Sequence, residues 1–264
     1  SFTNSLKKKD LKEIDKVGQR NTGTKITFKP DESFFDTEKI SAKSLSYSLR
    51  AKAVLCPGLK IKFKNEISGD KEEWCFVDGL GHYLSTELGE GTYVPGEPII
   101  GEFSDDETAL SWAVIWERGD RESLSESYVN LIPTMQGGTH VSGMRTGITD
   151  AIKEFCDYRK LLPKGVKLTP DDVWKNCSYI LSAKLKDPQF TGQTKEKLSS
   201  KDFQNIATSI TKDSFSIWLN QETQAAEEIA FLCIENAQAR ARASQKVERT
   251  VSYTHLRAHE TETN

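Results

Sequence analysis

The clearest pattern in the sequence is YVNLIPTMQGGTHVSGMRTGITDAIKEFCDYR at residues 128–159, in which a strand, a glycine-containing loop and a helix follow one another. Residues 126–133 are apolar and rich in strand-forming types. From Val141 to Phe155 the apolar residues recur every three or four positions, as on the buried face of a helix. This order predicts a domain in which helices pack on a sheet.

Patterns of the same kind extend in both directions from this stretch. On its C-terminal side they predict a strand within residues 174–186 and a long helical region from 199 to 249. On its N-terminal side they predict strands at 24–28 and 109–116, a helix that begins near the cap candidate Ser44 and ends at Pro57, a hairpin of residues 59–64 and 73–77, and a short helix at 80–88.

The length of 264 residues suggests two domains. The stretch GEGTYVPG at residues 89–96 is the best candidate for a linker, so we expect one domain at 1–95 and another at 97–250. Residues 251–264 break the helical pattern and are expected to be a non-native tail. The chain begins with Ser1, and we expect it to be a fragment of a longer protein.

Composition excludes several classes of protein. The 36 Lys and Arg residues against 39 Asp and Glu give a net charge of −3, so a polyanion would have to be bound by a local basic patch. No apolar run approaches the length of a membrane span, and we expect no membrane partner. Five cysteines without a CxxC spacing argue against a zinc site or a disulfide framework, and favour a cytoplasmic protein without metal ligands.

Two polar loops are candidates for binding an anion. In QGGTHVSG at residues 136–143 the glycines permit positive φ, and Thr139 would cap the following helix, although a plain tight connection is the more frequent role of such a loop. In DPQFTGQTKEKLSS at 187–200, Gln193 and Lys195 are two positions apart, so their side chains would project the same way in an extended loop and suit a terminal phosphate. A solvated surface lysine is the more frequent role of such a residue.

The last helical region ends in four basic residues: Arg240, Arg242, Lys246 and Arg249. They suit sequence-independent binding of DNA phosphates. They would equally complement the negative end of the helix dipole. The sequence leaves these two roles open.

Several long strings resemble one protein family. The strings at residues 128–140 and 187–200, with EFCDYRKLLPKGVKL at 154–168 and AKAVLCPG at 51–58, closely resemble the B subunits of the bacterial type IIA DNA topoisomerases. The resemblance covers about residues 15–250. PTMQGGTH and the LSS that follows the loop lysine are more similar to the topoisomerase IV branch than to gyrase.

The resemblance implies an α+β fold. Residues 1–95 would be the C-terminal part of a GHKL ATPase α/β sandwich, and 97–250 a transducer domain like domain 2 of ribosomal protein S5, ending in a long helix. Gln193 and Lys195 match the transducer loop that contacts the γ-phosphate of ATP, and Lys195 would have the catalytic role. Thr24 and Ile26 match the adenine end of the ATP pocket.

The resemblance also implies the activity of an ATP-dependent type II DNA topoisomerase, an isomerase. ATP with Mg²⁺ would dimerise two subunits through the ATPase gate and trap double-stranded DNA, and the A subunit of topoisomerase IV would cleave it. The general base, the Mg²⁺ ligands and the glycine-rich lid are expected upstream of this chain, so the chain alone is expected to be inactive. The alternatives are the B subunit of gyrase and a non-enzymatic α/β module that binds protein or DNA.

Overall fold

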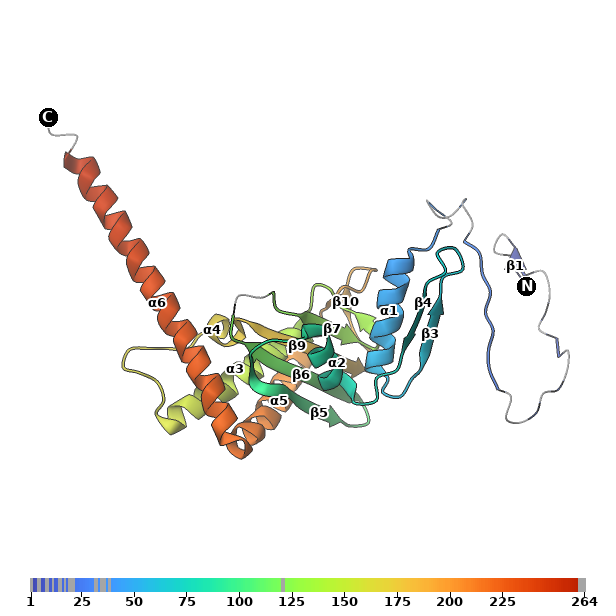
Figure 1. Cartoon of the computed structure of the whole chain (residues 1–264), viewed down its shortest axis with the longest axis horizontal. Helices are drawn as coiled ribbons and strands as arrows, with labels where there is room; N and C mark the ends of the chain where they lie inside the picture. The colour runs from blue at the N-terminus through green and yellow to red at the C-terminus, as the bar shows by residue number, and fades with distance from the viewer. Residues whose placement is uncertain are drawn as a thin grey trace. The chain divides into compact units, whose positions relative to one another are not determined.

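The structure is a computed structural model that describes residues 39–119 and 122–260, the last sixteen of these by backbone alone. Before residue 39 it describes 2–3 and 6–7 by backbone, and 10, 12–13, 16, 18, 22–30, 33 and 37. The chain forms two compact units, Ser1–Leu45 and Ser46–Asn264 (Figure 1).

The first unit contains two short antiparallel strands, β1 (Phe2–Thr3) and β2 (Leu6–Lys7). Residues 22–30 have no regular secondary structure, so the strand expected at 24–28 is wrong. Its alternating pattern is strand-like, but a strand also needs a neighbour for its backbone hydrogen bonds. No described residue pairs with 24–28.

A five-stranded sheet forms the centre of the second unit. Its strands are β5 (Tyr93–Ser104), β6 (Thr108–Glu117), β9 (Cys177–Leu185), β7 (Ser125–Val129) and β8 (Ile132–Pro133), in this spatial order. Neighbouring strands are antiparallel except β7 and β9, which are parallel and joined through the helix that follows β8. The strands expected at 109–116, 126–133 and 174–186 are thereby confirmed.

Two helices, α1 (Ala42–Leu55) and α2 (Gly79–Leu88), supply the apolar cover of one face of this sheet. Val54, Tyr83 and Leu84 pack there against Ala113 and Ile115 of β6. The antiparallel hairpin of β3 (Ile61–Lys64) and β4 (Lys71–Trp74) lies between the two helices in sequence, as expected.

The other face of the sheet is covered by three long helices: α3 (Thr139–Arg159), α5 (Lys201–Gln221) and α6 (Thr223–Glu260). Trp112, Val114 and Trp116 of β6 point to this side, as alternation along a strand requires. Helices α3 and α5 approach closely at Gly143. A Cβ at this position would lie only 2.5 Å from the carbonyl oxygen of Gln204, too close for two packed atoms. The short helix α4 (Pro170–Trp174) contacts both α3 and α6.

Some expected boundaries differ from the structure. Ser41, not Ser44, caps α1, because its Oγ accepts a 3.3 Å hydrogen bond from the Ser44 N–H. The linker expected at 89–96 is partly strand, since β5 begins at Tyr93. Helix α6 continues through Val251, where a break was expected. None of the described helices is long and apolar enough to cross a membrane.

Candidate functional site

The two polar loops, 60 residues apart in sequence, are hydrogen-bonded to each other. The Gln136 N–H donates to the carbonyl oxygen of Glu196 at 3.0 Å, and Gln136 Nε2 donates to the Glu196 carboxylate at 2.7 Å. The Leu198 N–H donates to the carbonyl oxygen of Gly137 at 3.1 Å. We call this contact the loop junction (residues 134–143 with 189–200). The loop that carries Lys195 is therefore held on the loop that precedes residue 139.

Two glycines make the loop junction possible. Gly137 and Gly138 have φ of 64° and 136°, which side-chain-bearing residues rarely adopt. A Cβ on Gly138 would overlap the backbone of Leu198. Thr139 does not cap α3 as expected, because it is already the first residue of the helix and Gly138 occupies the cap position. Within the described part of the chain, the buried Oγ1 of Thr139 has no hydrogen-bond partner.

Lys195 lies on an exposed turn between the short strands β10 (Phe190–Thr191) and β11 (Lys197–Leu198). Its backbone is left-handed, with φ of 57°, and Gln193 is in the turn before it. The extended geometry expected for the pair is therefore wrong, since a turn does not alternate its side chains as a strand does.

The ammonium of Lys195 has only a weak contact. Its Nζ lies 5.8 Å from the centroid of the Phe190 ring, a cation–π contact of modest strength at an exposed position. No ion pair found among the described residues includes Lys195. Its charge is thus available to an anion that approaches the turn.

His140 is a structural residue of the loop junction. It is fully buried, and its Nε2 lies 3.1 Å from Thr134 Oγ1, which in turn lies 2.7 Å from Ser127 Oγ. Burial lowers the pKa of His140 to about 4, because the charged imidazolium is disfavoured away from water. The ring is therefore neutral near pH 7, with one N–H donor and one acceptor nitrogen.

A cavity of about 730 Å³ opens beside the loop junction. Three basic residues line it, Arg145, Lys197 and Lys201, together with Thr139 at the start of α3. The Arg145 guanidinium lies 5.2 Å from the centroid of the Trp174 ring, which orients it. The sequence patterns did not single out this group, because Arg145 lies far in sequence from Lys197 and Lys201. Its positive charge suits an anionic neighbour.

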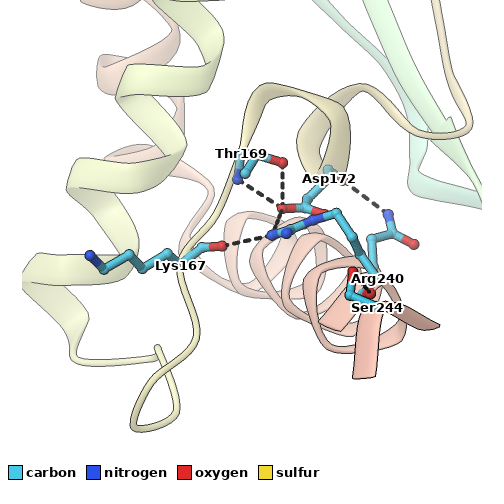
Figure 2. A network of polar contacts seen from close by, with 6 residues as sticks. Lys167, Thr169, Asp172, Arg240 and Ser244 are labelled. Atoms are coloured by element: carbon cyan, nitrogen blue, oxygen red, sulfur yellow. Dashed lines mark hydrogen bonds and ion pairs between the residues drawn. The ribbon is translucent and has the colours of Figure 1, made fainter. Parts of the chain in front are cut away.

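The basic residues at the end of α6 have different surroundings. Arg240 is bound to Asp172, as Figure 2 shows, whereas Arg242 is exposed and makes no ion pair within the described residues. The side chains of Lys246 and Arg249 lie outside the described residues. The two roles considered for these four residues were to complement the helix dipole and to bind DNA phosphates. These roles therefore do not apply equally to all four.

The other expected site residues lie in the first unit. Thr24 and Ile26 belong to the segment 22–30, and both are exposed there. Among the described residues, no three His, Cys, Asp or Glu side chains gather as a metal ion would require.

Comparison with known proteins gives consistent results. The family model for DNA gyrase B matches residues 62–249. The B subunits of DNA topoisomerase 4 from Salmonella typhimurium and from Escherichia coli are each 50% identical over 249 residues, which are 94% of this chain and 40% of the relative. The chain thus spans about 40% of the length of these relatives.

Solved structures agree with the family match. A topoisomerase IV ATP-binding domain of Francisella tularensis, solved with a small-molecule inhibitor, has a TM-score of 0.74 and 44% identity, and the match covers 88% of this chain and 63% of that one. The 43K ATPase domain of Thermus thermophilus gyrase B has a TM-score of 0.70 over 83% of this chain and 59% of that one, but only 22% identity, and so shows the fold alone. The expected α+β fold class is confirmed.

Proposed function

Because the chain belongs to the DNA gyrase B family, we propose that it is part of the ATPase subunit of a type II DNA topoisomerase of the topoisomerase IV branch. The observation that carries the proposal is the position of Lys195. Its ammonium is exposed on a turn, and this turn is hydrogen-bonded to Gln136 and Gly137, just before α3. A cation presented in this way can bind a terminal phosphate and report its presence to the rest of the domain.

We propose that Lys195 and Gln193 bind the γ-phosphate of ATP. The ammonium would stabilise the charge that develops on the phosphoryl oxygens, and the Gln193 amide would donate a hydrogen bond to one of them. Thr24 and Ile26 would lie at the adenine end of the pocket. Mg²⁺ bound with the ATP would be held by residues other than those described here.

The loop junction supports a relay from the nucleotide to the helices. When hydrolysis removes the γ-phosphate, the Lys195 turn would lose its partner. Because Gln136 and Gly137 bind this turn, its movement would act on the start of α3. Helix α5 would follow, since the close approach at Gly143 leaves no room for sliding. Residues 97–250 would thus act as the transducer, and 1–95 as the end of the ATP-binding domain.

The intact protein is proposed to act in the cytoplasm. Two copies would dimerise through the ATPase gate and enclose double-stranded DNA, and the A subunit of topoisomerase IV would cleave it. Arg242, Lys246 and Arg249 are the proposed phosphate contacts of α6. The B subunit of gyrase is the competing assignment within the family, and decatenation rather than supercoiling by the intact enzyme would support the topoisomerase IV branch.

The proposal is tested by ATP hydrolysis in the intact protein. We expect Lys195→Ala to lower turnover by about 100-fold, as the loss of a group that stabilises developing charge does. Lys164→Ala is the matched control, because Lys164 is an exposed lysine that lies outside both the loop junction and the basic cavity. Equal turnover in the two folded variants would contradict the role of Lys195.

A further inference from the structure

Helix α6 changes its surroundings near Arg240. Residues 226–237 contribute several side chains to the core, and Ala237 is the last of the described residues to be buried. Residues 239–244 are all exposed. Arg240 therefore lies where the helix stops packing on the domain.

At this point the Arg240 side chain turns back to the domain and binds it through three hydrogen bonds (Figure 2). Nε donates to Asp172 Oδ1 at 2.8 Å, and Nη2 donates to Asp172 Oδ2 at 2.9 Å. Nη2 also donates to the carbonyl oxygen of Lys167 at 3.1 Å. Two parallel bonds to one carboxylate are the strongest arrangement open to an arginine, and they fix its direction.

Asp172 is held equally firmly on its own side. The residue is only 3% exposed, and its Oδ2 accepts hydrogen bonds from the Thr169 N–H at 2.8 Å and the Thr169 hydroxyl at 2.7 Å. Burial alone would raise the pKa of Asp172, but the hydrogen bonds from Arg240 and Thr169 outweigh it and lower the pKa. The carboxylate is thus ionised and cannot turn towards water.

A second contact joins the same two elements. Asn236, one turn before Arg240, donates from Nδ2 to the carbonyl oxygen of Asp172 at 3.0 Å. One residue of α4 is therefore held by two successive turns of α6, through its side chain and through its backbone. This arrangement leaves little freedom for α6 to rotate or shift against α4.

We infer that Asp172 and Arg240 form a latch that sets where and in which direction α6 leaves the domain. Arg240 is accordingly a positioning residue rather than a phosphate contact, because a DNA phosphate could bind its guanidinium only by leaving a buried carboxylate without its partner. The basic residues that follow along the helix would be oriented by the latch.

Hydrogen exchange of the chain in the absence of DNA tests the latch. We expect Arg240→Gln to speed amide exchange at residues 236–244 by about tenfold or more, because hydrogen bonds to a charged group are lost at one place. Arg242→Gln is the matched control. It removes the same charge two residues further along the helix, from a side chain that makes no ion pair among the described residues. We expect exchange in this control to match the original chain.

Two further variants separate the latch from a general loss of stability. Arg240→Lys keeps the charge but cannot bond both carboxylate oxygens with a planar fork, so it should give an intermediate increase at 236–244 with unchanged exchange in α3. In a double-mutant cycle with Asp172→Asn, the effects of the two residues should not add. Additive effects, or exchange in Arg240→Gln equal to that in Arg242→Gln, would overturn the inference.

Discussion

Lys195 and Arg240 are both cations chosen from the sequence as phosphate contacts, but their surroundings differ. Lys195 lies on an exposed turn and has only the Phe190 ring beside it among the contacts described. Arg240 is bound to a carboxylate that is 3% exposed. Lys195 can exchange its weak contact for an anion at little cost. Arg240 already binds an anion, the Asp172 carboxylate.

The difference shows what decides whether a basic residue is available. Spacing and exposure do not separate the two residues, since Arg240 is itself exposed along its helix. The deciding feature is a buried carboxylate 68 residues earlier in the chain. A buried ion pair is costly to break from one side, because the remaining charge stays away from water.

The largest expected effect is on the Arg240 side of the comparison. Asp172→Ala should lower the free energy of unfolding by about 3 kcal/mol, because it removes the carboxylate that accepts hydrogen bonds from Arg240 and from Thr169 at the start of α4. Glu196→Ala, next to Lys195, should cost about 1 kcal/mol or less, as expected for a partly exposed hydrogen bond. Denaturant unfolding measures the loss of unfolding free energy in both variants. Equal losses would contradict the difference between the two sites.

A smaller effect is expected where the Lys195 loop meets α3. Gly138→Ala should lower the free energy of unfolding by about 2 kcal/mol more than Gly137→Ala, because only at Gly138 does the added Cβ overlap the Leu198 backbone. Both positions have positive φ, but the φ of 136° and ψ of −160° at Gly138 belong to a region that is almost exclusive to glycine, so backbone strain adds to the contact there. If the two variants unfold alike, the two loops are not held together as described.

The pH dependence of stability follows from His140. Burial lowers its folded pKa to about 4, below the unfolded value of about 6.5, so the unfolded state binds more protons between these values. The stability from the neutral ring is complete above about pH 6.5 and decreases as the pH falls towards 4. From about pH 7.5 to about pH 5.5 we expect a loss of about 1 kcal/mol, absent in a folded His140→Gln variant. The exposed His82 provides the control: His82→Gln should leave this pH dependence unchanged.

The smallest effect is expected in DNA binding. For the intact protein, Arg242→Gln should reduce the slope of log affinity against log salt by about one, the contribution of one phosphate contact. Arg240→Gln should leave this slope almost unchanged, because Asp172 already uses its charge. A reduction by about one in Arg240→Gln alone would show that the latch opens on DNA.

Local patterns predicted most elements correctly. The strand at β7 and the helix at α3 depend on apolar residues that are close in sequence, and both were confirmed. The strand expected at 24–28 failed because an alternating pattern carries no information about a pairing partner.

The candidate site was predictable only in part. Gln193 and Lys195 stand out by composition and family resemblance, but their turn geometry depends on a left-handed residue that the sequence does not mark. The docking of this turn on Gln136 and the pairing of Arg240 with Asp172 join residues 60 and 68 positions apart. Such contacts come from tertiary packing, so periodicity cannot reveal them.

A structure of the intact protein with a non-hydrolysable ATP analogue tests the central claim most directly. We predict that Lys195 Nζ leaves the Phe190 ring and lies about 3 Å from a γ-phosphate oxygen, at hydrogen-bond distance. In the same structure Arg240 should still bind Asp172. A bound analogue with Lys195 still over Phe190 would contradict the account.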